Sequence, residues 1–151
     1  VTGVQTCALP ISLTKFYSFV EAVHEKKHDL GSDTLKWILT SDAPSLAWTQ
    51  LSSVTGQLST ANGYTQNDKV MTVTSSAQSS GLYTLIASDV TWTASGGNLG
   101  SGSFRYAILY NDTSTNDLLI GYLDYGYLVT VASGQTFTLD FDQTSGIYYA
   151  S

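Results

Sequence analysis

Four hydrophobic side chains near the start of the chain recur at spacings of three and four: Phe16, Phe19, Val20 and Val23. This spacing places them on one face of an α-helix, where they would form a buried stripe. Gly31 follows as a stop signal for the helix. The pattern therefore predicts a single helix over about residues 14–28.

From residue 32 onward the pattern changes to short runs rich in β-branched and aromatic residues. The predicted strands are residues 34–40, 69–74, 82–87, 90–94, 104–110, 118–124, 128–131 and 136–141. Turn-forming residues separate them, at residues 75–81, 95–103, 111–117, 124–126 and 132–135, and residues 43–63 are predicted to be irregular. This order predicts a mainly β chain, a β-sandwich or jelly-roll-like domain with one N-terminal α-helix that covers a face or an edge.

Two predicted strands differ in whether one or both of their faces are expected to be buried. In residues 104–110 both alternating sets of side chains are mostly apolar, which predicts a central strand. In residues 136–142 apolar and polar positions alternate, which predicts one buried and one exposed face. The inward set is Phe137, Leu139 and Phe141, and the outward set is Thr138, Asp140 and Asp142.

The first twelve residues, VTGVQTCALPIS, differ in character from the rest. They resemble the translation of a common sequencing-adapter oligonucleotide joined in frame to a gene. A secretion signal is the competing interpretation, but the segment has no basic region before its short apolar stretch. We therefore expect residues 1–12 to be foreign to the fold and residues 13–151 to form a single domain. Residues 13–151 contain no cysteine, which excludes disulfides and thiolate metal sites within them.

The charge of the chain narrows the choice of partners. Its 151 residues carry a formal net charge of −6, and only 12% of them are charged. An acidic surface is repelled by phosphate backbones and anionic lipids, so we expect neither nucleic acid nor a membrane as a partner. No apolar run approaches the roughly 20 residues of a membrane-spanning helix.

Residues 24–28, HEKKH, match the zinc-protease pattern H-E-x-x-H. Such a site needs two histidines one helical turn apart, a glutamate general base and a third ligand from elsewhere. The two histidines and the glutamate are present as His24, His28 and Glu25. A third ligand is missing, because no histidine or glutamate follows them in the chain. The alternative is the C-terminus of the helix, where basic residues 26–28 interact favourably with the helix dipole. We expect this alternative, without a metal or cofactor.

Other catalytic patterns have less support. Both histidines lie on the predicted helix and no G-x-S-x-G elbow occurs, so a serine triad is not indicated. The Gly/Ser run at residues 100–103 lacks the lysine of a phosphate-binding loop. Asp140 and Asp142 are paired carboxylates, as glycoside hydrolysis requires, but they lie on the outer face of their strand. We therefore expect no catalytic residues.

Residues 112–117 carry oxygen-bearing side chains at alternating positions, as calcium loops do. An EF-hand would need glycine where Asp117 stands and glutamate where Leu123 stands. The same residue types are ordinary in hairpin turns, which is the interpretation that we favour. Asn111, Asp112 and Thr113 also form a glycosylation sequon, which has meaning only in a secreted eukaryotic protein.

Tyrosine is the remaining candidate for function, since the chain has ten tyrosines. Five of them form the candidate interface: Tyr122, Tyr125, Tyr127, Tyr148 and Tyr149. An apolar ring with a polar tip suits a half-buried contact between proteins, which is the first interpretation. A sugar-stacking platform is the second, and it would require coplanar exposed rings along one sheet face.

Several segments together resemble a family of small virion proteins from tailed bacteriophages. They are KFYSFVEAV, HDLGSDTLKWILTSDAPS, NGYT, SSAQSSGLYTLIASDVTWTASGG, FRYAILYNDT, LIGYLDYG and VASGQTFTLDFDQTSGI. In this order they span about residues 15–147, and FRYAILYNDT followed by LIGYLDYG is the most distinctive pair. Residues 100–103 depart from the family, which tends to have a shorter, proline-containing turn there. The resemblance implies a β-rich capsid or tail component, in particular a head-decoration protein, without an active site.

We therefore expect a non-enzymatic structural protein that is made in the bacterial cytoplasm and incorporated into a phage virion. Its expected partners are phage capsid or tail proteins and further copies of itself, as a homo-oligomer. The lack of cysteine in residues 13–151 fits assembly in a reducing cytoplasm. The alternative is a phage tail or adhesion component that acts as a carbohydrate-binding module.

Overall fold

The computed structural model of the chain describes residues 4–7 and 13–151. It is mainly β, with 42% of the residues in strands, one short helix near the N-terminus, and antiparallel sheets packed as in a sandwich. The strands are β1 (Val4–Cys7), β2 (Thr14–Lys15), β3 (Leu35–Thr40), β4 (Lys69–Met71), β5 (Val73–Ser79), β6 (Leu82–Ala87), β7 (Val90–Thr93), β8 (Phe104–Asn111), β9 (Leu118–Val129), β10 (Thr136–Leu139) and β11 (Tyr148–Ala150). The helix is α1 (Tyr17–His24). The predicted sandwich-like fold with one N-terminal helix is confirmed.

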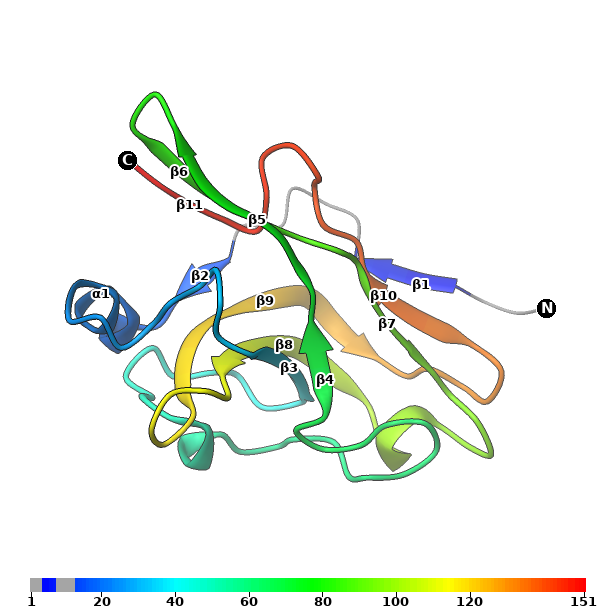
Figure 1. Ribbon diagram of the computed structural model, residues 1–151. Coiled ribbons are helices and arrows are strands. Elements are labelled where there is room, and N and C mark those ends of the chain that lie inside the picture. Colours follow the sequence, from blue (N-terminus) through cyan, green and yellow to red (C-terminus); the bar gives the residue numbers. More distant parts are fainter. Residues whose placement is uncertain (1–3, 8–12) are drawn as a thin grey trace.

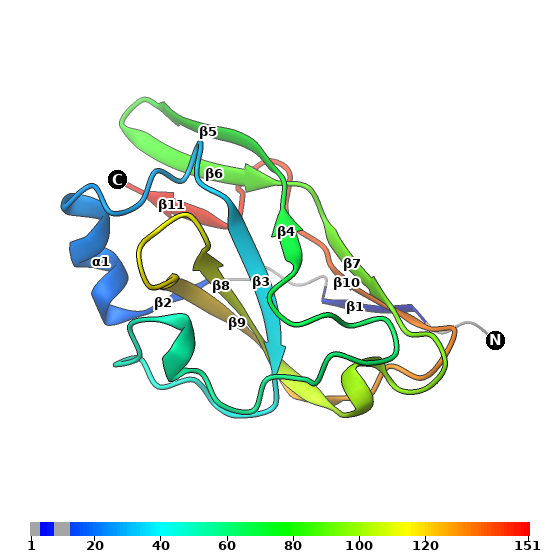
Figure 2. The same cartoon turned by 60° about the horizontal axis from the view of Figure 1, so that its bottom comes forward.

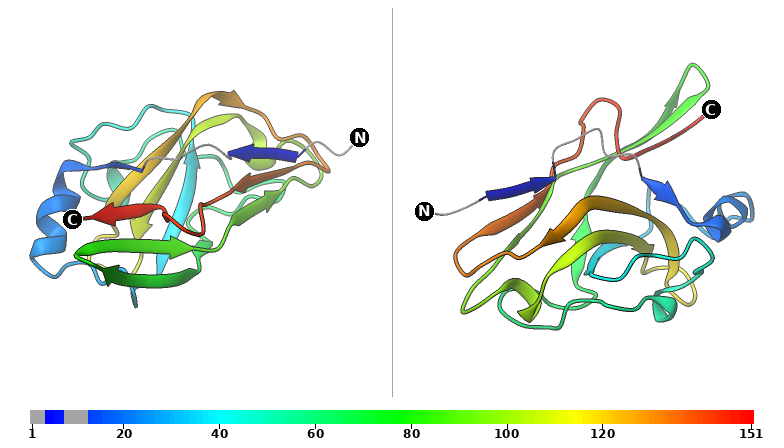
Figure 3. Two further views of the ribbon diagram at one scale, coloured as in Figure 1. Left: turned by 90° about the horizontal axis from the view of Figure 1, so that it is seen from above. Right: turned by 180° about the vertical axis from the view of Figure 1, so that it is seen from behind.

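The strands form one larger and two smaller sheets (Figure 1). The larger sheet has five strands in the order β2-β9-β8-β3-β4. The smaller sheets have the orders β1-β10-β7 and β11-β6-β5. Seen from above, β6 continues into β7 and β11 lies in line with β10, so the smaller sheets extend one another (Figure 3, left). The chain passes from the five-stranded sheet to a smaller one between β4 and β5, at Thr72.

Aromatic side chains join the layers through the main core. Trp37 of β3 stacks on Phe141 with ring centroids 5.7 Å apart, and Phe104 of β8 meets Phe137 of β10 edge-on at 4.7 Å. All four side chains are buried. Burying a large apolar side chain stabilises the fold by about 1.5–3 kcal/mol, so contacts of this kind hold the layers together.

A second hydrophobic cluster covers the opposite face of the five-stranded sheet. Its buried members are Phe16, Ile38, Ile108, Tyr110 and Leu119. Three side chains from the irregular segment pack on it: Trp48, Leu51 and Val54. The sheet is therefore buried on both faces, and β8, between β9 and β3, is the central strand that the apolar pattern predicts. The irregular segment, which contains Trp48, Leu51 and Val54, runs beneath this sheet (Figure 2).

Helix α1 is shorter than predicted. Thr14 and Lys15 form β2, which pairs with β9, and the helix ends at His24. Phe19 and Ala22 are buried, whereas Val20 is 50% exposed. The predicted buried stripe is therefore wrong at Val20, because the short helix rests on the sheet along a narrower face than the spacing indicated.

Three strands also differ from the prediction. Strand β5 includes residues 75–79, which were expected to form a turn, because the turn consists only of Ser80 and Gly81. Strand β9 is continuous through residues 124–126, where a second turn was expected. Strand β11 was not predicted at all. The polar and glycine-containing segments joined sheets because their backbone hydrogen bonds depend on neighbouring strands, which local composition does not reveal.

The predicted boundary at residue 12 concerns a segment that the structure describes only in part. Val4–Cys7 forms β1 and pairs in parallel with β10, with Val4 opposite Thr136. The rest of residues 1–12 lies outside the described residues. In the described part of the chain, no helix has the length and apolar character needed to cross a membrane.

Candidate protein-binding site

Strand β9 departs from regular pairing with β8 near its C-terminal end. The pairs on either side of the irregularity are Phe104 with Val129 and Tyr106 with Asp124. One residue of β8, Arg105, therefore faces four residues of β9. These four, Tyr125, Gly126, Tyr127 and Leu128, are called the β9 bulge below. Extra residues on one strand cannot all join the ladder, so the strand bends out of the sheet.

An ion pair holds the base of the β9 bulge. Arg105 donates from Nε to Asp124 Oδ1 at 2.7 Å and from its terminal nitrogen to Oδ2 at 2.9 Å. Asp124 Oδ1 also accepts a hydrogen bond from the backbone N–H of Gly126 at 2.8 Å. The hydrogen bond from Arg105 is the main reason why the pKa of Asp124 lies below its ordinary value. The bidentate geometry fixes where the bulge leaves the strand.

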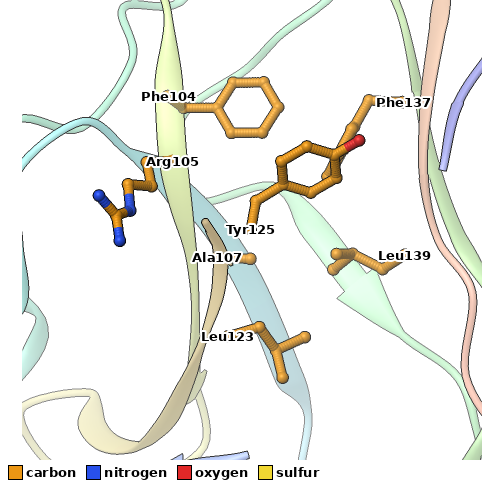
Figure 4. Close-up of a pocket in the computed structure, with 7 residues that line it drawn as sticks. All are labelled: Phe104, Arg105, Ala107, Leu123, Tyr125, Phe137 and Leu139. Carbon is orange, nitrogen blue, oxygen red and sulfur yellow. The ribbon is translucent and has the colours of Figure 1, made fainter. Parts of the chain in front are cut away.

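Tyr125 turns inward from the bulge and closes the space between two sheets. Its ring lies 5.7 Å from that of Phe137 and beside Phe104 and Leu139 (Figure 4). The pocket that these residues line is too small to hold a water molecule. Tyr125 therefore plugs the edge of the core, and the pocket is filled by the protein's own side chains.

The two residues at the end of the bulge face solvent. Tyr127 is 61% exposed and Leu128 is 60% exposed. The ring of Tyr127 meets that of Tyr125 at 5.0 Å with an angle of 71° between their planes. The inward tyrosine thus supports the outward one from below. The bulge presents an aromatic ring and an isobutyl group on a base that is fixed by the ion pair and by core packing.

The other three tyrosines of the predicted interface lie elsewhere. Tyr122 is half-buried and packs against Phe16, with ring centroids 5.7 Å apart. Tyr148 is half-buried against Phe19 at 5.4 Å. Tyr149 is 66% exposed on β11. Of the five predicted residues, the structure brings Tyr125 and Tyr127 into contact, while Tyr122 and Tyr148 support the helix side of the fold.

The end of the helix divides the HEKKH segment. His24 is the last residue of α1, Glu25 caps the helix, and Lys26 has a backbone φ of 59°. His24 is exposed, whereas His28 is buried against Phe19 with ring centroids 5.3 Å apart. The two imidazoles therefore do not lie one turn apart on a helix. The prediction that the helix continues to His28, with residues 26–28 in its last turn, is wrong, since only His24 lies there.

Glu25 is also unsuited to act as a general base. Its carboxylate pairs with Lys27 Nζ at 2.5 Å on the surface. This hydrogen bond lowers the pKa of Glu25, whereas a glutamate that takes up protons near neutral pH needs a raised pKa. Within residues 4–7 and 13–151, no three histidine, cysteine, aspartate or glutamate side chains are arranged to hold a metal ion.

His28 instead belongs to a buried hydrogen-bond network. Its Nδ1 lies 3.0 Å from Nδ2 of Asn111, which also donates to Asp33 Oδ2 at 2.6 Å. Since the amide nitrogen donates, His28 Nδ1 accepts, and the proton of the neutral ring is on Nε2. Nε2 is buried without a hydrogen-bond partner. Burial is the main cause that lowers the pKa of His28 below its ordinary value.

Residues 112–117, the candidate calcium-binding loop, form a hairpin turn between β8 and β9. Asn111 Oδ1 accepts hydrogen bonds from the backbone N–H groups of Thr113 and Ser114, at 2.9 and 3.1 Å. Asp112 pairs with Lys36 Nζ at 2.8 Å. The side chains of this loop thus satisfy the turn itself. Asn111 is fully buried, so its amide is not accessible to a glycan.

The paired carboxylates at the end of β10 are exposed, as the alternation predicts. Asp142 accepts hydrogen bonds from the backbone N–H groups of Ser145, at 2.8 Å, and Thr144, at 2.7 Å. These bonds lower the pKa of Asp142. A general acid would need a raised pKa, so Asp142 is a turn-capping residue.

The tyrosine pattern of the sequence predicts Tyr125 and Tyr127 as interface residues but does not indicate Arg105, Asp124 or Leu128. The signal was present in LDYGYL, where an aspartate precedes an aromatic, a glycine and a second aromatic. Gly126 has a backbone φ of 101°, a conformation that favours glycine, as a bulge or a turn would both require. Only the register of β8 against β9 distinguishes a bulge from a turn.

In comparisons with known proteins, no family model, curated protein or solved structure matches the chain.

Proposed function

We propose that this chain is a non-enzymatic structural protein of a bacteriophage particle, specifically a head protein that decorates the capsid. Its partner is a repeating lattice of coat proteins. The resemblance over residues 15–147 points to this class of virion protein. The β9 bulge is the surface that we assign to the contact.

The observation that carries the proposal is the exposure of Tyr127 and Leu128 on a bulge whose base is held by an ion pair and by aromatic packing. Residues that dominate binding energy between proteins are large side chains, tyrosine among them, that fill pockets on the partner. Binding is stronger when such residues are already held in place, because less conformational entropy is lost. The ion pair between Arg105 and Asp124 and the wedge of Tyr125 provide this order.

The chemistry of the bulge matches an apolar pocket on another protein. No charged residue occurs between Asp124 and Asp140. The side chains of the bulge itself can therefore be buried without removing a charge of their own from water, a step that costs several kcal/mol. The net charge of −6 would meanwhile limit non-specific association of the free protein.

Ring geometry favours a protein over a sugar as the partner. A sugar-stacking platform needs coplanar exposed rings, whereas Tyr125 and Tyr127 are inclined at 71° and Tyr125 faces the core. Tyr127 offers a single ring beside an aliphatic side chain. This combination fits a hydrophobic pocket between proteins better than the flat face of a sugar.

Co-sedimentation tests the proposal. The purified chain is mixed with undecorated capsids assembled from the coat protein of the same phage. We expect the wild type to sediment with the capsids and a Tyr127→Ser/Leu128→Ser variant to stay in the supernatant. Tyr17→Ser/Val20→Ser is the matched control, because it removes an exposed aromatic and an exposed aliphatic side chain from α1 instead. A wild type that does not sediment, or a bulge variant that sediments equally, would refute the assignment.

A further inference from the structure

Strand β5 is an open edge of a sheet. In the order β11-β6-β5 it lies outermost, and within the described residues β6 is the strand that pairs with it. The hairpin formed by β5 and β6 extends beyond the rest of the fold (Figures 1 and 2). Residues 76–82 are exposed along it. Its outer backbone groups are therefore accessible to another strand.

The turn at the tip identifies which backbone groups point outward. Ser80 and Gly81 have φ values of 52° and 84°, which is the pattern of a two-residue type I′ turn. In such a hairpin the flanking residues, Ser79 and Leu82, exchange backbone hydrogen bonds, and every second residue of β5 then faces β6. Gln78 lies between two such residues, so its N–H and C=O point away from β6.

This edge lacks the features that normally prevent strands from pairing. Exposed edges in soluble proteins are usually protected by lysine, proline, inward charges or a bulge. Between Lys69 and Asp89 the chain contains no charged residue and no proline. The one register shift of β5 lies between Val73 and Ser75, at the end far from the tip. The edge near Gln78 is uncharged and keeps a regular register with β6.

We propose that β5 pairs with β5 of a second copy of this chain, antiparallel across a two-fold axis at Gln78. The smaller sheet would then continue through six strands. At the axis the outward N–H of Gln78 meets the outward C=O of Gln78 in the second copy, and the reverse, so the edge is complementary to itself there. This contact is separate from the β9 bulge, and it does not depend on the proposed capsid function.

Charge also favours an axis at Gln78. The chain is acidic, so two copies associate only where their carboxylates stay apart. The acidic loop that contains Asp29 and Asp33 lies beside Ser76, because a Cβ on Gly31 would come within 3.1 Å of Ser76 Oγ. With Gln78 on the axis, Ser76 lies opposite Ser80 of the second copy. The two acidic loops are then at opposite ends of the paired strands.

Sedimentation equilibrium over a range of concentrations gives the first test. We expect a reversible monomer–dimer equilibrium for the wild type and a monomer for Gln78→Pro, because proline removes the outward donor and is tolerated at an edge. Gln78→Ala is the matched control. It also loses the hydrogen bond from Gly81 N–H to Gln78 Oε1, but it keeps the backbone N–H and should dimerise. A monomeric wild type, an open polymer, or a dimer unaffected by proline would refute the pairing.

A charge exchange at the axis gives the second test, which does not depend on how well the proline variant folds. In the proposed dimer the two side chains at position 78 lie opposite one another, where like charges repel and opposite charges attract. We expect Gln78→Lys and Gln78→Glu each to weaken self-association about tenfold or more, and an equimolar mixture to restore it. Circular dichroism establishes that each variant is folded. Failure of the mixture to restore a dimer would refute the axis at Gln78.

Discussion

The buried side chain of Asn111 connects three parts of the chain. Its Oδ1 binds the turn at Thr113 and Ser114, and its Nδ2 binds Asp33 and His28. The segment that follows the helix is thereby fixed against the end of β8. A buried network of this kind stabilises the fold only while every member keeps the protonation state that its partner requires.

His28 makes the stability of this network depend on pH. Because burial lowers its pKa in the folded chain, the unfolded chain binds more protons just below the ordinary pKa of 6.5. The free energy of unfolding should therefore fall as the pH drops below that value, until His28 is protonated in the folded chain too. Protonation would also turn Nδ1 into a donor facing the donor Nδ2 of Asn111.

Urea denaturation between pH 7.5 and 5 measures this effect. We expect the wild type to lose stability as the pH falls. A His24→Asn variant should lose as much stability as the wild type, because His24 is exposed and lies outside the buried network. A His28→Asn variant should be less stable at neutral pH and should show a smaller loss on acidification. Equal slopes for the two variants would contradict this role of His28.

Two substitutions at Asp124 separate the charge of this residue from the hydrogen bonds that it accepts at the base of the bulge. Asp124→Asn removes the ion pair with Arg105 but keeps an oxygen that can accept from Arg105 Nε and from the Gly126 N–H, whereas Asp124→Ala removes the ion pair and all of these hydrogen bonds. We expect the alanine variant to be less stable than the asparagine variant by about 1 kcal/mol or more, since one hydrogen bond contributes about 1 kcal/mol net. Thermal unfolding of both variants measures the difference, and equal stabilities would show that the hydrogen bonds to this oxygen contribute nothing.

Elements whose own residues show a regular pattern of hydrophobic and polar positions were predictable from the sequence. Elements that depend on hydrogen bonds with neighbouring strands were not. The alternation of Phe137, Leu139 and Phe141 correctly predicts the buried face of β10 and of the residues that follow it, since successive side chains of an extended strand point to opposite faces. The composition of residues 75–79 predicts a turn because serine and glutamine resemble loop residues, although these residues pair with β6 as part of β5. The sequence around Gly126 predicts a turn because a glycine of this conformation fits both a turn and a bulge, and only the register of β8 against β9 decides between them.

One turn in the irregular segment depends on a glycine for its position. Gly63 has a φ of 95°, and a Cβ there would collide with the carbonyl oxygen of Thr93 at the end of β7. The turn thereby places the buried Tyr64, whose hydroxyl accepts a hydrogen bond from the backbone N–H of Leu39 at 3.1 Å. The absence of a side chain at residue 63 lets this segment pack closely.

A matched pair of glycine substitutions tests this packing. Gly134 has a φ of 83° with no atom within 4 Å of an added Cβ, so Gly134→Ala should cost about 1–2 kcal/mol from backbone strain alone. Gly63→Ala adds the collision with Thr93 and should cost roughly 3 kcal/mol or more. Chemical denaturation compares the two variants. Equal losses would show that the 61–64 turn can move away without consequence.

Across the whole molecule, the large side chains are either buried in two clusters or exposed on a few elements. The aromatic core between the sheets and the second cluster beneath the five-stranded sheet together account for most of the large side chains. The large hydrophobic side chains that are exposed lie on α1, on β4, on the smaller sheets and on the β9 bulge. The sequence could identify tyrosine as the residue type of an interface. It could not show that Tyr122 and Tyr148 are used within the fold, because both packing and binding favour the same ring.

The contribution of the β9 bulge to capsid binding is the central claim, and a binding isotherm measures it most directly. Truncating two residues central to an interface should cost about 1.4–2.8 kcal/mol in total, so Tyr127→Ala/Leu128→Ala should weaken binding roughly 10- to 100-fold. Since both side chains are exposed, the free energy of unfolding should change by less than about 0.5 kcal/mol. The Tyr17→Ser/Val20→Ser control should bind within about twofold of the wild type. An isotherm for the bulge variant that coincides with that of the wild type would contradict the account.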